Sequence, residues 1–456
     1  MSSISAPLPP PADTLGEHIA RTLKLALPVM FSRAGLLVLA AVDSAMTGHA
    51  SSTELAYYAL AAAPQIFTML IGIGLLLGTV VLTAQADGAG RTQETGVVWR
   101  IALLHAAGYG LLMLGLMYTG EAFLLTIGQS ADLAQGAGQV MIIFGWSLPA
   151  MLLYIATTLF LEGIGRPLPS LLIMIIANLL NAFLNWLLIY GNWGFPALGA
   201  EGAALATTIV RWFMFFAVAA YTWLYIDTLR YGVRGPLKDG WRLARTLRRI
   251  GYPMALTQGL ESGSFTAMTL FAGLLGPVQV AAFQIIMTLI ALVFMCALGF
   301  STAASVRVGN AVGRRDPRGV RLAGWTAVGL VIIVLSACGL AFISVPEWLV
   351  SIYSNDPEVL AVAGSALAIA AIILIPDGVQ AVLMGSLRGI ADVWPASAMF
   401  FIAFWLVMIP LGYLLGVVWG GGAHGLVKAI FAGCITAAVL LAMRFQVVSA
   451  RIHKAV

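Results

Sequence analysis

Long apolar segments separated by short polar connections fill this chain from about residue 24 to residue 446. Each of twelve such segments holds about the 20 residues, or more, that an α-helix needs to cross a bilayer. They cover residues 24–48, 55–86, 96–118, 133–161, 168–191, 200–226, 248–275, 279–309, 321–344, 359–386, 394–418 and 423–446. The segments are continuous apolar runs without period-two alternation, which excludes a transmembrane β-barrel. The pattern predicts an all-α integral membrane protein with twelve transmembrane helices.

The composition agrees with this prediction. Of the 456 residues, 61% are hydrophobic and only 9% are charged, whereas about 25% of the residues in a soluble domain are charged. The net charge of +5 does not indicate a nucleic-acid partner, because the basic residues are scattered among the connections. The histidines and cysteines lack metal-ligand spacing, and we expect no organic cofactor.

The charges of the connections alternate along the chain. Odd-numbered connections contain no lysine or arginine. Even-numbered connections contain Arg91, Arg166, the set Arg230, Arg234, Lys238, Arg242 and Arg245, the set Arg314, Arg315 and Arg318, and Arg388. Cytoplasmic connections of membrane proteins carry such an excess of basic residues. We therefore expect an even number of spans in the cell inner membrane, with both termini in the cytoplasm.

The two halves of the chain resemble each other weakly. The sequence DGAGRTQE (87–94) follows the second span, and NAVGRRDP (310–317) follows the eighth. In the same way FLEGIGRPLP (160–169) follows the fourth span, and GSLRGIADVWP (385–395) follows the tenth. Two six-span halves with the same orientation predict two pseudo-symmetric lobes around a central cavity, related by an axis along the membrane normal.

This division gives expected boundaries. We expect a disordered or interfacial cytoplasmic tail over 1–23, an N-lobe over 24–226, a cytoplasmic linker over 227–247, a C-lobe over 248–447 and a cytoplasmic tail over 448–456.

Three acidic residues interrupt the apolar runs. They are Asp43 in LLVLAAVDSAM, Glu261 in MALTQGLESGSF and Asp377 in AIILIPDGVQAV. A carboxylate at the bilayer centre costs roughly 2.5–3.5 kcal/mol on insertion scales, so such residues mark ion or substrate pathways. The acids do not repeat between the halves, because the equivalents of Asp43 and Asp377 fall near Met268 and Ala150. The chemistry is therefore divided unequally between the predicted lobes.

A row of asparagines in the fifth span accompanies Asp43. Asn178, Asn181 and Asn185 are spaced i, i+3 and i+7, which puts them on one helical face. Amide oxygens are neutral ligands for a hard cation, and Asp43 supplies a charge. We predict a cation or proton site at Asp43, Asn181 and Asn185, with Asn178 as a candidate co-ligand. The alternative is hydrogen bonding between helices, at about 0.6 kcal/mol each.

Glu261 and Asp377 form the predicted ion site of the C-lobe, with Na⁺ or a proton as the ion. Gln258 lies one turn before Glu261, and Gln380 one turn after Asp377, as candidate co-ligands. Pro376 removes a backbone hydrogen bond beside Asp377, which frees a carbonyl oxygen for coordination.

Weaker candidates follow from residue type. Gln284 is a candidate co-ligand or a packing residue, and Tyr353 a co-ligand or an interfacial anchor. Prolines kink helices, and kinks can act as hinges. Methionine and aromatic side chains suit promiscuous binding of planar cations. The candidate hinges are Pro28, Pro64 and Pro376, and the candidate cavity residues are Met46, Phe265, Met268, Phe283 and Met287.

Several motifs in order carry a resemblance to a known family. The first half contains LPVMFSRAGLLVLAAVDSAMTGH, GLLLGTVVLTAQADGAGR, NLLNAFLNWLLIYG and LGAEGAALATTI. The second half contains YPMALTQGLESGSF, AAFQI, SVRVGNAVGRRD and IPDGVQAVLMGSLRGIAD. Together they resemble the multidrug and toxic compound extrusion (MATE) family, NorM-type branch, over residues 20 to 447.

The resemblance implies export of cationic or amphipathic drugs through a two-lobed protein of twelve helices, driven by inward flow of Na⁺ or H⁺. The family's N-lobe acid matches Asp43, its asparagine pair matches Asn181 and Asn185, and its C-lobe acids match Glu261 and Asp377. Some branches carry an acid at the position of Asn185, so the N-lobe site is less acidic here.

The predicted function is a cation-coupled antiporter with small organic substrates, a secondary transporter and not an enzyme, acting as a monomer in the lipid bilayer. One alternative is a flippase for lipids or lipid-linked saccharides, which needs a cationic cavity. The predicted intramembrane acids outnumber the clearly intramembrane basic residues and disfavour it. The other is an intramembrane enzyme, but the chain contains no HExxH, no GxSxG and no matched Ser/Lys pair.

Overall fold

A computed structural model describes residues 14–236, 240–354 and 356–455 of the chain. Residues 1–13 of the expected N-terminal tail and Lys238 of the expected linker lie outside the described residues. Within these ranges every regular element is a helix.

The helices fall into two successive sets. The first set comprises α1 (Leu15–Ala50), α2 (Ser52–Leu76), α3 (Gly78–Gly88), α4 (Thr92–Met117), α5 (Gly120–Thr126), α6 (Ala131–Gly163), α7 (Leu168–Leu188), the 3₁₀ turn η1 (Asn192–Gly194) and α8 (Gly199–Tyr225). The second comprises α9 (Gly240–Gly273), α10 (Pro277–Gly313), α11 (Pro317–Ser344), α12 (Pro346–Ser351), α13 (Pro357–Gly389), α14 (Val393–Phe401), the π-helix η2 (Ile402–Met408), α15 (Ile409–Gly412), the π-helix η3 (Tyr413–Val418) and α16 (Gly422–Ala455).

Eleven of the twelve expected spans appear as helices that are long and apolar enough to cross a membrane, counted over the described part of the chain. The expected second span divides at Leu77 into α2 and α3, and the expected eleventh span runs from α14 to η3. The remaining span is α9, whose middle carries Gln258 and Glu261 and is therefore too polar to qualify by composition.

Three helices extend beyond the expected boundaries. Helix α1 begins at Leu15 because Thr14 and Glu17 form a capping box: the Thr14 hydroxyl accepts from the Glu17 amide at 3.3 Å, and the Glu17 carboxylate accepts from the Thr14 amide at 2.8 Å. Residues 240–247 of the expected linker belong to α9. Helix α13 continues to Gly389, so the expected end of this span at residue 386 was wrong; Arg388 lies buried in the last turn of the helix.

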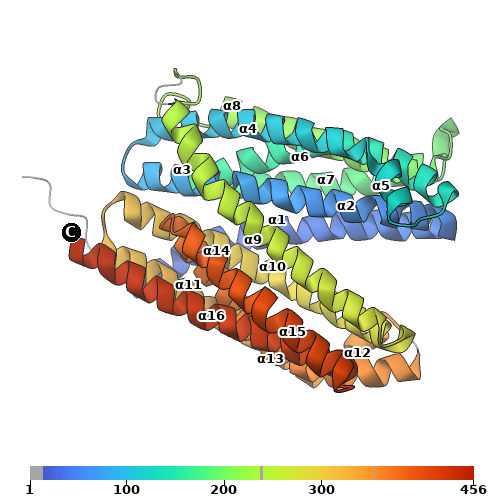
Figure 1. Cartoon of the computed structure of the whole chain (residues 1–456). Coiled ribbons are helices and arrows are strands. Elements are labelled where there is room, and N and C mark those ends of the chain that lie inside the picture. The colour runs from blue at the N-terminus through green and yellow to red at the C-terminus, as the bar shows by residue number, and fades with distance from the viewer. Residues whose placement is uncertain (1–13, 237–239, 355, 456) are drawn as a thin grey trace, which may run out of the picture.

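The helices form two bundles with the same internal packing (Figure 1). In the bundle of α1–α8, α6 packs against α2, α4 and α8. In the bundle of α9–α16, α13 packs against the equivalent helices α10, α11 and α16. The repeat of contacts confirms two pseudo-symmetric lobes, which we call the N-lobe and the C-lobe.

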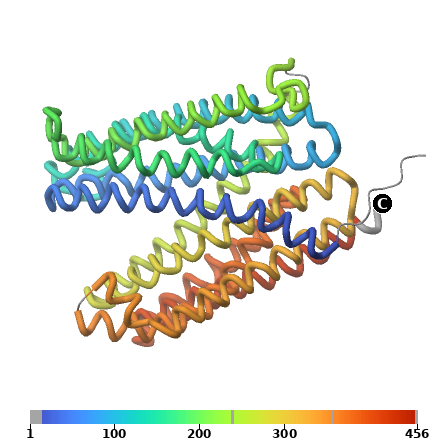
Figure 2. The backbone as a smooth tube through the Cα atoms, turned by 180° about the vertical axis from the view of Figure 1, so that it is seen from behind, coloured from blue at the N-terminus to red at the C-terminus, as the bar shows by residue number. Residues whose placement is uncertain are grey.

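The lobes meet at one end and diverge toward the other. Inter-lobe contacts join α1 to α10, α2 to α9 and α3 to α10. Helix α1 (blue in Figure 2) runs along the N-lobe and continues across to the C-lobe. The lobes lie far apart at the end that carries α5 and α12 (Figure 1).

Glycines allow the lobes to approach at the joined end. A methyl group on Gly88 of α3 would lie 2.2 Å from the Asn310 carbonyl oxygen, and one on Gly313 of α10 would lie 2.2 Å from the Gln85 carbonyl oxygen. The Gln85 amide nitrogen also donates to the Gly389 carbonyl oxygen at 2.9 Å. The two backbones therefore touch here, without room for a side chain between them.

We predict that Gly88→Ala destabilises the protein, because the added methyl group forces α3 and α10 apart. Overpacking of this kind costs about 1–3 kcal/mol. The midpoint of thermal unfolding in detergent measures the effect. Gly115→Ala is the control, because a methyl group on Gly115 of α4 meets no atom within 4 Å. Equal midpoints for the two variants would show that the close approach is unimportant for stability.

Candidate functional site

The Asp43 carboxylate connects four helices of the N-lobe. It lies in α1 and is 1% exposed. One oxygen, Oδ1, accepts a hydrogen bond from the Asn185 amide of α7 at 2.7 Å. The other, Oδ2, accepts from the Thr207 hydroxyl of α8 and, at 3.5 Å, from the Tyr58 hydroxyl of α2. The structure thus brings together Asp43 and Asn185, as the sequence predicts, and adds two hydroxyl groups.

Asn181 completes this cluster, whereas Asn178 does not join it. The Asn185 side-chain nitrogen Nδ2 donates to the Asn181 side-chain oxygen Oδ1 at 3.3 Å, and both residues are fully buried. Asn181 Nδ2 and Asn185 Oδ1 have no hydrogen-bond partner among the described residues. Asn178 donates to the Met174 carbonyl oxygen of its own helix at 2.9 Å. A buried amide oxygen without a partner is costly and is available to a cation or to a proton donor.

Asp43 opens onto a cavity between the lobes. The cavity has a volume of about 360 Å³ and is lined by α1, α2, α6, α8, α9, α10 and α13. Asp43, Tyr58 and Thr207 belong to its wall, while Asn181 and Asn185 lie behind them in α7. Apolar and sulfur-containing side chains form much of the remaining wall: Ile66, Met69, Leu70, Phe144, Met151, Met214 and Met295.

Three arginines also line this cavity. They are Arg33, Arg211 and Arg388, against Asp43 as the single acid in the wall. The expectation that acids outnumber basic residues is therefore wrong for the wall of this cavity. Arg211 of α8 donates to the Ser147 hydroxyl of α6 at 2.7 Å.

A buried charge cluster lies where the lobes meet. Glu162 of α6 has a side chain that is 2% exposed, and it pairs with Arg33 of α1 at 3.2 Å. Arg388, from the C-lobe, is within electrostatic range of Glu162 and also lies 3.3 Å from the Ser305 hydroxyl. Glu162 and Arg388 occupy equivalent positions of the repeat, in LEGIG and LRGIA. The pseudo-symmetry thus brings opposite charges to matching positions.

The two acids of the C-lobe, Asp377 and Glu261, interact electrostatically. Asp377 of α13 accepts from the Gln380 amide at 3.3 Å, and the Cys434 thiol of α16 lies 3.6 Å away. Glu261 of α9 is half-buried and interacts with Asp377 through space. Gln258 points elsewhere, because it lines the inter-lobe cavity. No group of three or more metal-ligating His, Cys, Asp or Glu side chains occurs in the described ranges.

The other candidates lie away from these clusters. None of Met46, Phe265, Met268, Phe283 and Met287 lines the inter-lobe cavity, and Met268 and Phe283 are fully buried in the C-lobe. Residue type does not fix the rotation of a helix, and this explains their different placement. Gln284 and Tyr353 are exposed. Pro28, Pro64 and Pro376 lie inside α1, α2 and α13.

Sequence reasoning missed four residues of these clusters. Thr207 lies inside the motif LATTI, next to Thr208. The sequence does not give the rotation of this helix, so it does not show which of the two hydroxyl groups faces Asp43. Tyr58 gives no signal. Glu162 and Arg388 occupy equivalent positions in the two repeats. Aligning the two halves of the sequence could therefore have identified this pair.

Two bundles of equivalent packing, with buried acids in both and a cavity between them, define the class of two-lobed membrane transporters. A family model described as MatE matches residues 28–187 and 253–414, one segment in each lobe. The chain belongs to the MatE family, which confirms the resemblance seen in its motifs.

Relatives and solved structures agree with this assignment. The chain is 36% identical to a "Probable multidrug resistance protein NorM" of Caulobacter vibrioides, covering 98% of this chain and 95% of the relative. It is 30% identical to a "Multidrug resistance protein NorM" of Aliivibrio fischeri, covering 94% of each. A eukaryotic MATE transporter has a similar fold, with a TM-score of 0.87 at 21% identity over 97% of this chain and all of that one. An outward-facing multidrug resistance MATE family transporter gives a TM-score of 0.88 at 18% identity over 96% of this chain and 97% of that one.

We predict that Thr207→Val lowers the free energy of unfolding by about 1 kcal/mol or more, because it leaves the buried Oδ2 of Asp43 with only the Tyr58 hydroxyl, at 3.5 Å, as a donor. Unfolding in mixed detergent micelles measures this loss. Thr222→Val is a matched control, since the Thr222 hydroxyl is buried and donates only to Val218 of its own helix. An equal loss in both variants would argue against the importance of the bond to Asp43.

Proposed function

We propose that this protein is a cation-coupled antiporter that exports small organic compounds, with Asp43 as the group that links the ion to the substrate. The observation that carries the proposal is the position of Asp43, which contacts a buried amide and opens onto the inter-lobe cavity. The names of the relatives, multidrug resistance proteins, support the class of substrate.

The proposed orientation places the joined end of the lobes in the cytoplasm. The basic connections support it: Arg230 and Arg314 both lie near Asp87, at the end of α3. The cavity then belongs to an arrangement open toward the outside of the inner membrane. Both termini lie in the cytoplasm in this orientation. Since one chain holds both lobes, the proposed active unit is a monomer.

The exchange follows from differential binding. A ligand shifts the equilibrium between two arrangements only by as much as it prefers one of them. A proton or Na⁺ on Asp43 cancels the charge that attracts a cationic substrate, so ion entry from outside favours substrate release there. The Thr207 hydroxyl can rotate to accept from a protonated Asp43, so the cluster accommodates both states.

The C-lobe acids provide a second proposed ion site. Two carboxylates within electrostatic range repel each other unless one holds a proton or both share a cation. Carboxylate and amide oxygens of Asp377, Glu261 and Gln380 suit Na⁺ as well as H⁺. The proposed coupling ion is therefore one of these two, and gradients imposed separately distinguish them.

A second candidate function gains support from the cavity wall. Arg33, Arg211 and Arg388 give the cavity the cationic character that a flippase for anionic lipid-linked compounds needs. Arg33 is paired with Glu162, however, and Arg211 is hydrogen-bonded to Ser147, so part of this charge is already engaged. Translocation of a fluorescent lipid by reconstituted protein without dye export would establish the flippase instead.

We predict that Asp43→Asn, Glu261→Gln and Asp377→Asn each reduce ion-driven dye export about 5- to 150-fold, the usual range of coupling between sites. Each amide keeps the size of the acid but neither takes up a proton nor carries the charge. The assay is efflux from proteoliposomes under an imposed Na⁺ gradient or an imposed pH gradient, each alone.

Glu201→Gln is the control, because Glu201 is exposed at the start of α8. Equal orientation and amount of inserted protein are checked for every variant. Full export by the Asp43 variant under both gradients would refute its role in coupling.

A further inference from the structure

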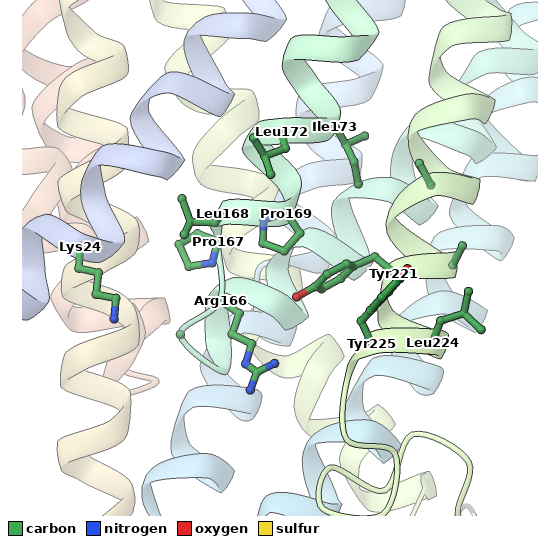
Figure 3. A pocket seen from close by; sticks show the side chains of 13 residues that line it. Lys24, Arg166, Pro167, Leu168, Pro169, Leu172, Ile173, Tyr221, Leu224 and Tyr225 are labelled. Atoms are coloured by element: carbon green, nitrogen blue, oxygen red, sulfur yellow. The ribbon is translucent and has the colours of Figure 1, made fainter.

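A second pocket lies on the N-lobe and shares no residue with the inter-lobe cavity. Its volume is about 720 Å³. Helix α1, the connection from α6 to α7, the start of α7 and the adjoining face of α8 form its wall (Figure 3). It lies at the end of the N-lobe that carries the basic connections, because Arg166 of the connection from α6 to α7 lines it.

Two cations flank this pocket. Lys24 of α1 and Arg166 of the connection are exposed, and within the described ranges neither side chain has a hydrogen bond or an ion pair. Figure 3 shows the nitrogen atoms of both side chains extending toward the same edge of the pocket. Helix α7 begins between them without a side-chain cap, and the first turn of a helix carries partial positive charge. The edge of the pocket is therefore strongly attractive to an anion.

The rest of the pocket is apolar. Leu168, Leu172 and Leu224 are 54%, 60% and 68% exposed and lie on α7 and α8 along its wall. Tyr221 and Tyr225 border it, as tyrosines do at the level of lipid headgroups. Figure 3 shows Leu172 above the cations and Leu224 across the pocket beside Tyr225.

We propose that this pocket binds a phospholipid with a net negative headgroup from the adjacent leaflet. The phosphate lies between Lys24 and Arg166, and an acyl chain lies along Leu168, Leu172 and Leu224. Basic pockets between transmembrane helices on the cytoplasmic side bind such headgroups in other proteins. A zwitterionic lipid carries an ammonium group that these cations repel, and a cationic drug is repelled in the same way.

A bound lipid would also link the two lobes. Lys24 lies in the part of α1 that packs on the C-lobe: the Thr22 hydroxyl accepts from Arg307 at 2.7 Å, and a methyl group on Gly299 would lie 2.7 Å from the Ala26 carbonyl oxygen. Arg166 follows α6 of the N-lobe. A phosphate that contacts both cations therefore ties the N-lobe to the segment of α1 that packs on the C-lobe.

The test is native mass spectrometry of the full chain released from detergent micelles that contain either phosphatidylglycerol or phosphatidylcholine with the same acyl chains. We expect preferential retention of phosphatidylglycerol. In Lys24→Gln and in Arg166→Gln we expect the preference for phosphatidylglycerol to fall about fivefold, because one basic residue near the surface attracts anionic lipid by about 1 kcal/mol. In the double variant we expect a fall on the order of 25-fold.

Arg318→Gln is the control, because Arg318 is exposed at the start of α11 and lines neither pocket. Equal retention of the two lipids by the wild-type chain would overturn the proposal. So would loss of preference in the Arg318 variant to the same degree, since that would indicate nonspecific attraction to net charge. Displacement of the lipid by an equal concentration of inorganic phosphate would show that the apolar wall contributes nothing, and would also overturn it.

Discussion

The cost of keeping a carboxylate away from water determines the architecture of the N-lobe. Asp43 is stabilised in the interior by donors that no single helix can provide, so α1, α2, α7 and α8 must converge on it. Removing any one helix from this arrangement would leave a buried charge with too few partners. The same group that makes the site chemically useful therefore also fixes how the bundle packs, and a change in its charge is transmitted to four helices at once.

The two lobes share a backbone plan but not a chemistry. In the N-lobe a single acid is surrounded by amides and hydroxyl groups, whereas in the C-lobe two acids interact with each other and with Gln380. Between them lies a cavity with arginines on its wall, next to apolar and methionine side chains. The fold supplies two matching bodies, and the unequal substitutions give each body a different set of buried polar groups.

Hydrophobic pattern, loop charge and the weak internal repeat were enough to predict the spans and the two halves, because burial in a bilayer restricts which residues can occur where. The sequence did not predict that α9 begins eight residues earlier than expected or that α13 includes Arg388. Polar residues near the ends of spans resemble those of connections, so the pattern places them outside the helices. The partners of Asp43 required the rotation of α2 and α8, which no periodicity in those nearly uniformly apolar helices reveals. The prediction of the cavity residues failed for the same reason. Met268 and Phe283 are of the same residue types as Met69 and Phe144, and only the packing of the helices determines which of them line the cavity.

The positions of Glu162 and Arg388 bear on how such a chain could have arisen. They are repeat-equivalent, lie on opposite sides of the pseudo-twofold axis, and are near enough to attract. An ancestral homodimer built from either half alone would have placed glutamate against glutamate or arginine against arginine at that axis. In this chain each half supplies the charge that the other lacks at this position, so the attraction depends on the two halves having different sequences.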